Sequence, residues 1–69
     1  MNYSEFITLL KNNNINLFDA QSRVVYYRLN NHINQGNNIN NMSSTKLNLL
    51  VDSLLDNYET RIKYILSLD

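Results

Sequence analysis

The chain contains no proline and a single glycine, Gly36, and this scarcity of helix-interrupting residues most constrains its fold. Proline breaks a helix because it lacks a backbone donor and its ring clashes with the preceding turn. Hairpin-rich β domains also depend on turns rich in glycine and proline. Apolar residues recur instead at helical spacing, as in Tyr3, Phe6 and Leu10. The sequence therefore predicts an all-α fold.

Three helices are expected in a single domain. The first spans about residues 3–12, because Asn2 can cap its start and the run Asn12–Asn14 can adopt the left-handed conformation that ends a helix. The second spans about residues 17–35. Its cap is either Asn16 or Asp19, and in both cases Asp19 lies near the positive end of the helix dipole.

Gly36 is expected to end the second helix, since glycine is the residue that most often follows a helix C-terminus. Residues 36–43 then form a polar loop, and Ser43 caps a third helix over about residues 44–67. This helix is expected to be long and amphipathic. Its apolar stripe comprises Leu47, Leu50, Val51, Leu54, Leu55, Tyr58, Ile62, Ile65 and Leu66, and its polar face comprises Asp52, Asp56, Glu59 and Lys63.

The chain is short for a stable core, because a domain of this size buries only about 60% of the surface that its unfolded form exposes. It has no cysteine and one histidine, His32, so disulfides and ordinary structural zinc sites are excluded. We expect the second and third helices to pack antiparallel, with the first laid across them. The two shorter helices would not cover the long third one, and a homodimeric bundle would complete its burial.

Charge and composition predict the cellular location of the protein and the type of genome that encodes it, more than its function. Six basic and six acidic residues give a formal net charge of zero, which argues against electrostatic steering toward nucleic acid or an anionic membrane. The chain opens without a basic n-region and contains no apolar run of about 20 residues, so we expect a cytoplasmic protein without a membrane span. Fourteen asparagines suggest an AT-rich genome, such as that of a low-GC bacterium, phage or plasmid.

The sequence shows no catalytic arrangement. A nucleophile or an acid–base group needs a second group to support it, and His32 has no acid nearby in the sequence. No phosphate-binding glycine loop, zinc spacing or nucleotide fingerprint is present. We therefore expect no enzymatic activity, no metal, no cofactor and no small-molecule substrate.

The stretch RVVYYR, residues 23–28, is the most informative for function. On a helical wheel, one side of the second helix carries a core stripe of Phe18, Ser22, Val25, Tyr26, Leu29 and Ile33. Val24 and Tyr27 fall on the opposite side, beside both arginines. This outer side either packs under the first helix or forms a contact surface, since Tyr and Arg are enriched at interface hot spots. A third alternative is a different helical phase, because VVYY alone would also suit a strand.

The favoured interpretation is a small interaction protein of adaptor or inhibitor type, with a protein partner, a second copy of itself, or both. Its contact surface is predicted to comprise Arg23, Val24, Tyr27, Arg28, Asn31 and Asn34. Tyr27 would be the anchor, and the arginines would bind carboxylates on the partner. The alternative is a small dimeric DNA-binding regulator, with the first two helices as a helix-turn-helix and Arg and Asn side chains reading bases.

Overall fold

The computed structural model describes residues 1–33 and 39–67, and these residues form four α-helices and no strand. The predicted all-α fold is therefore confirmed. The helices are α1 (Tyr3–Asn12), α2 (Asp19–His32), α3 (Ser44–Leu55) and α4 (Glu59–Ser67). The prediction of three helices is wrong, because the expected helix over residues 44–67 is divided into α3 and α4.

Helix α1 begins and ends as its sequence predicts. Asn2 accepts a hydrogen bond from the backbone of Glu5 at 2.8 Å, and the Glu5 carboxylate accepts one from the backbone of Asn2 at 2.9 Å, which together form a capping box. At the other end Asn14 has a positive φ of 58°. This conformation lets the Ile15 N–H reach the Leu10 carbonyl at 2.9 Å and turns buried Ile15 onto the core.

Helix α2 is shorter at its start than the sequence suggests. Neither Asn16 nor Asp19 caps it; Asp19 is its first residue, and the Gln21 side chain accepts from the Phe18 N–H at 2.9 Å. Phe18 is 79% exposed, so its predicted place in the core stripe is wrong. It precedes the helix and lies beyond the end of the stripe. The predicted stop at Gly36 lies outside the described residues.

A left-handed asparagine separates α3 from α4. Asn57 has a φ of 54°, and its N–H donates to the Leu54 carbonyl at 3.2 Å. The Tyr58 N–H donates to the Ser53 carbonyl at 2.9 Å. These two bonds form a Schellman motif, which satisfies the last carbonyls of α3 and turns the chain. Asn14 and Asn57 are the non-glycine residues with positive φ in the described part of the chain, and both end a helix.

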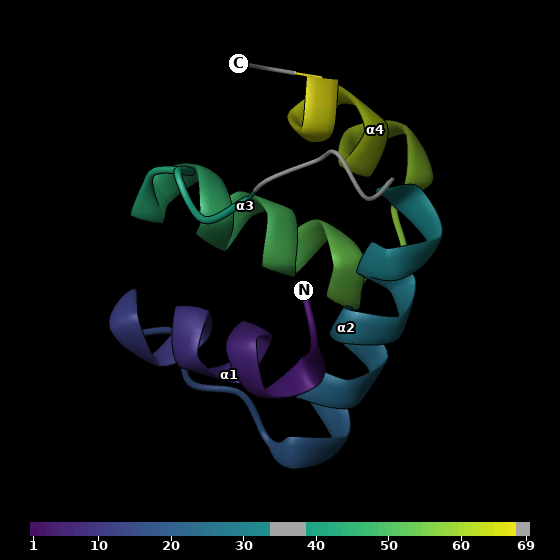
Figure 1. Ribbon diagram of the computed structural model, residues 1–69. Coiled ribbons are helices and arrows are strands. Elements are labelled where there is room, and N and C mark those ends of the chain that lie inside the picture. The colour runs from purple at the N-terminus through teal and green to yellow at the C-terminus, as the bar shows by residue number, and fades with distance from the viewer. Residues whose placement is uncertain (34–38, 68–69) are drawn as a thin grey trace.

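The turn at Asn57 changes the architecture. Helix α4 folds back against α3, and Ile62 and Ile65 become buried in one core with Leu47, Leu50 and Leu54 of α3. The molecule measures 25 × 23 × 22 Å, too short for a straight helix over residues 44–67. Figure 1 shows α2 crossing α3, so the expected antiparallel pair is also wrong. Because one chain closes the core, the argument that required a homodimer no longer applies.

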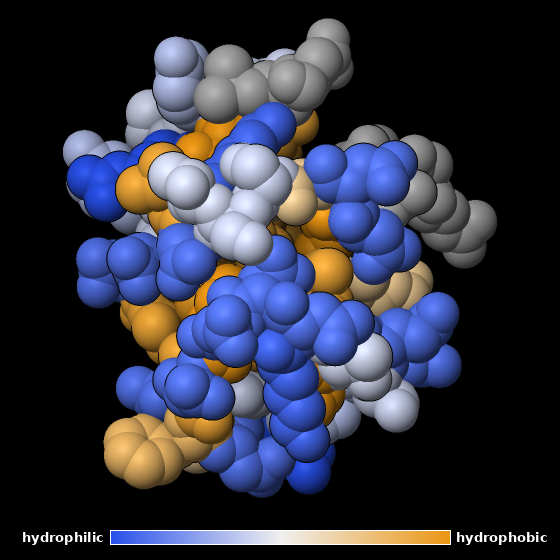
Figure 2. All heavy atoms as spheres, turned by 90° about the vertical axis from the view of Figure 1, so that its left-hand side faces the viewer, coloured by the Kyte–Doolittle hydropathy of each residue, from blue (hydrophilic) through white to orange (hydrophobic). Residues whose placement is uncertain are grey.

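The end of α1 and the start of α3 meet at a polar face. The Ser44 hydroxyl donates to the Asn13 side-chain oxygen at 2.5 Å, and the Asn13 amide donates to the Leu9 carbonyl at 2.8 Å. Figure 2 views the molecule from this side and shows hydrophilic side chains over much of it, with apolar atoms visible between them. Asn13 therefore acts both at the C-terminal end of α1 and in a contact between α1 and α3.

Candidate functional site

The stretch RVVYYR divides between core and surface as predicted. Val25 and Leu29 of α2 are fully buried, whereas Val24 is 40% and Tyr27 69% exposed. Helix α1 does not cover this outer side, because it packs against Tyr26: the Tyr3 and Tyr26 rings meet edge to face with centroids 5.3 Å apart. The interpretation that Val24 and Tyr27 pack under the first helix is therefore wrong.

A broad, open hollow of about 520 Å³ lies on this outer side of α2. Its lining consists of Arg23, Val24, Tyr27, Arg28, Asn31 and Asn57. We refer to these six residues as the α2 patch. Five of them belong to the predicted contact surface, and the sixth predicted residue, Asn34, lies outside the described residues. Asn57 was not predicted, because a continuous third helix would have carried it away; the asparagine signal used for the end of α1 could have identified it.

Arg23 is bound by other side chains of the same protein. Its Nε donates to the Asp19 carboxylate at 2.9 Å, and its guanidinium lies 5.0 Å from the centre of the Tyr3 ring. The Tyr3 hydroxyl also donates to Asp19, at 3.2 Å. The hydrogen bond from Arg23 lowers the pKa of the Asp19 carboxyl, and the same bond raises the pKa of Arg23. Reduced contact with water and the bond to Asp19 raise the pKa of the Tyr3 phenol.

Arg28 reaches across to α3. Its Nη1 donates to the carbonyls of Leu54 at 2.6 Å and Leu55 at 2.9 Å, both in the last turn of that helix. A cation at a helix C-terminus is stabilised by the helix dipole and satisfies carbonyls that lack a partner in the helix. Arg28 is half-buried, and it forms no ion pair with a carboxylate of the described residues. The two arginines of the α2 patch thus differ: Arg23 is neutralised by a carboxylate, and Arg28 is not.

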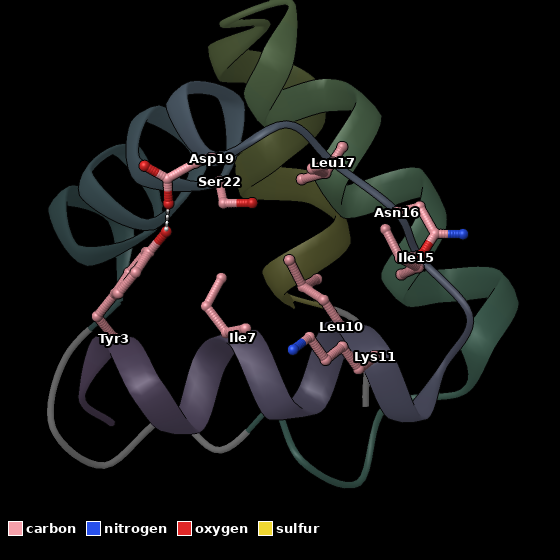
Figure 3. A pocket seen from close by; sticks show the side chains of 9 residues that line it. All are labelled: Tyr3, Ile7, Leu10, Lys11, Ile15, Asn16, Leu17, Asp19 and Ser22. Atoms are coloured by element: carbon pink, nitrogen blue, oxygen red, sulfur yellow. Dashed lines mark hydrogen bonds between the residues drawn. The ribbon is translucent and has the colours of Figure 1, made fainter.

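A second hollow, of about 310 Å³, lies between α1 and the start of α2. Figure 3 shows Ile7 and Leu10 pointing from α1 into this cleft, and the hydrogen bond from Tyr3 to Asp19 at one end. Leu17 lines it from the connecting segment. Because Asp19 also binds Arg23, the cleft and the α2 patch lie on either side of the same polar network.

Two further tyrosines are exposed near the C-terminal end. Tyr58 was expected in the apolar stripe of the third helix, but the turn at Asn57 moves it to the surface, where Arg61 lies 4.8 Å from its ring centre. Tyr64 of α4 is 64% exposed. Sequence analysis missed this surface, because the phase of one continuous helix places Tyr58 toward the core.

Comparison with known proteins finds no family model that matches the chain, and no significant match among curated proteins or solved structures. Within residues 1–33 and 39–67, no helix is long and apolar enough to cross a membrane. The same residues contain no group of three or more His, Cys, Asp or Glu side chains that could hold a metal ion.

Proposed function

We propose that this protein is a non-enzymatic interaction module that binds a segment of another protein through the α2 patch. The observation that carries the proposal is that Tyr27 is an exposed tyrosine that lines the hollow of the α2 patch. Its ring is largely exposed, and among the described residues its side chain has no hydrogen bond or ring contact. Tyr3 and Tyr26, in contrast, both use their hydroxyl groups within the molecule, on Asp19 and on the Met1 carbonyl.

Exposed tyrosine of this kind is well suited to binding. It supplies a large apolar area with few rotatable bonds, so little conformational entropy is lost when it is covered. Val24 extends the apolar surface by one helical turn on the same side, and Asn31 continues the line with an amide. Polar and charged groups around an aromatic centre are typical of an interface hot spot and its rim.

A second copy of the chain fits the α2 patch less well than a different protein does. A twofold contact between two α2 helices centred on Tyr27 would bring each Arg28 close to its own copy. Like charges facing each other across an interface are unfavourable. The homodimer predicted from the sequence is therefore not our preferred assembly.

The DNA-binding alternative is also less well supported. Arg23 would have to exchange its bond to Asp19 for a phosphate or a base, which leaves Arg28 as the one arginine of the α2 patch with donors available for a phosphate. Duplex binding through several phosphate contacts weakens steeply with salt. A titration with duplex DNA at low and moderate salt tests this alternative directly, and we expect no salt-dependent binding.

The proposal is tested by selecting random 12-residue peptides, displayed on phage, against the immobilised full chain. The binding affinity of the selected peptides is then measured for the wild type, for Tyr27→Ala and for Tyr64→Ala. The last variant is a matched control, since Tyr64 is as exposed as Tyr27 but belongs to α4. We expect the Tyr27 change to weaken binding at least about tenfold and the Tyr64 change to have little effect. A selection without peptides that depend on Tyr27 would refute the proposal.

A further inference from the structure

We propose that the α2 patch recognises an aspartate or glutamate side chain next to a large apolar residue, and that Arg28, not Arg23, binds the carboxylate. This inference rests on the proposed function and adds the chemistry of the partner. It follows from the different states of the two arginines and from the groups that line the hollow between them.

The charge of Arg28 is not balanced by a carboxylate of the described residues. Its hydrogen bonds go to two neutral carbonyls, through one of its terminal nitrogens. Asp56 follows the same turn of α3, yet no carboxylate oxygen of the described residues lies within 4 Å of the guanidinium. A guanidinium has five N–H donors in a planar fork that matches a carboxylate. Arg28 is half-buried and lines the hollow, so its remaining donors are placed to bind an anion there.

Arg23 is already engaged and is therefore not the main ligand of the partner's carboxylate. Its charge is balanced by Asp19 at 2.9 Å, and its guanidinium packs over Tyr3. A partner's carboxylate at Arg23 would have to compete with Asp19 and would meet the repulsion of that second negative charge. Its contribution is expected to be that of an exposed rim charge, which adds little to affinity.

The neighbouring residues of the hollow favour a large apolar side chain beside the carboxylate. Val24 and Tyr27 provide an apolar wall in the hollow, and covering it requires a large apolar side chain on the partner. Asn31 of α2 and Asn57 of the α3–α4 turn line the same hollow, and each carries a side-chain amide. Amides can donate to the partner's backbone carbonyls and accept from its N–H groups. The hollow thus presents one cation, one apolar wall and two amides.

The decisive experiment is a double-mutant cycle on the peptides selected through Tyr27. Because the random segment is fused to the coat protein at its C-terminal end, any carboxylate within it comes from a side chain. The acidic residue of a selected peptide is changed to its amide, and both peptides are titrated against the wild-type chain and against Arg28→Gln. We expect the change in the peptide to weaken binding to the wild type by roughly 10- to 100-fold, the range for a hydrogen bond between charged groups. On Arg28→Gln we expect the same change to have less than about a twofold effect, because the partner of the carboxylate is then absent.

Arg23→Gln is the matched control, and the acidic residue should retain its full effect on that variant. Circular dichroism and a urea titration check that each variant is folded. If Arg28→Gln does not fold, Arg28→Lys replaces it, since lysine keeps a donor for the carbonyls of α3 but loses the planar fork.

The outcomes separate the two proposals. The assignment to Arg28 would be overturned if the selected peptides depend on Tyr27 but lack an acidic residue. It would also be overturned if the effects of the acid-to-amide change in the peptide and of Arg28→Gln were additive. Either result would leave the proposed interaction module intact. If the acidic residue lost its effect on Arg23→Gln, Arg23 would be the arginine that binds the carboxylate, and the assignment to Arg28 would again be overturned. The absence of any Tyr27-dependent peptide would remove the proposed function itself.

Discussion

Asn57→Ala tests whether the left-handed turn between α3 and α4 holds the fold together. The φ of Asn57 is 54°, and an alanine there would meet the steric clash between its Cβ and the following carbonyl. The left-handed conformation costs an ordinary L-residue about 1–2 kcal/mol, and asparagine tolerates it better. We therefore expect the substitution to lower the free energy of unfolding by about 1 kcal/mol.

The variant could avoid this strain by extending α3 into a straight helix, but burial opposes that escape. Ile62 is 0% and Ile65 4% exposed, and both would leave the core if α4 no longer folded back. Each fully buried side chain of this size is worth about 1.5–3 kcal/mol, so straightening would lose roughly 3–6 kcal/mol. This loss exceeds the strain, and the turn should persist in the variant.

The assay is urea unfolding followed by circular dichroism, with Asn48→Ala as the control. Asn48 is an exposed residue within α3 whose amide donates to the Ser44 carbonyl. The same substitution there should leave stability unchanged or raise it by about 0.5 kcal/mol, because alanine is the better helix former. In a domain of this size, 1 kcal/mol corresponds to a shift of about 4–8 °C in Tm. The reasoning is refuted if Asn57→Ala is as stable as Asn48→Ala, or if its radius of gyration in solution rises well above 10.8 Å.

Three further predictions concern the core, the polar network and the assembly. Leu54→Ala should lower the free energy of unfolding by about 2–5 kcal/mol in the same urea assay, since Leu54 is fully buried, and a negligible change would show that it is not a core residue. The pKa of Asp19 is lowered in the folded state, so its ion pair should stabilise the fold above the ordinary aspartate pKa of about 3.9 and lose this effect as the pH falls toward the folded pKa. Thermal melts from pH 7 to pH 2.5 should therefore show a gap between the wild type and Asp19→Asn that closes on acidification; a gap that widens would contradict this sign. Light scattering coupled to size exclusion should give a mass near 8.1 kDa at all concentrations, whereas a stable dimer that Tyr27→Ala dissociates would show that the α2 patch binds a second copy.

Much of the local structure follows from the sequence, because it depends on residues close together in the chain. The capping box of Asn2 and Glu5 joins residues three apart, and Asn14 ends α1 through its own backbone preference. The inner and outer sides of α2 follow from the 100° step between residues, which places Val25 in the core and Tyr27 outside. Five of the six predicted contact residues consequently line one hollow.

Tertiary structure determined what depended on distant residues. Asparagine within a helix lowers the stability of that helix by only a few tenths of a kcal/mol relative to alanine. The sequence alone therefore does not show whether α3 continues through position 57 or ends there. The choice is made by burial of Ile62 and Ile65 in the core beside α3, and the turn also exposes Tyr58. The role of Arg28 was settled in the same way. Arg23 finds Asp19 one turn away on its own helix, whereas Arg28 finds carbonyls of α3, 26 and 27 residues along the chain, which come within reach only once the helices are packed.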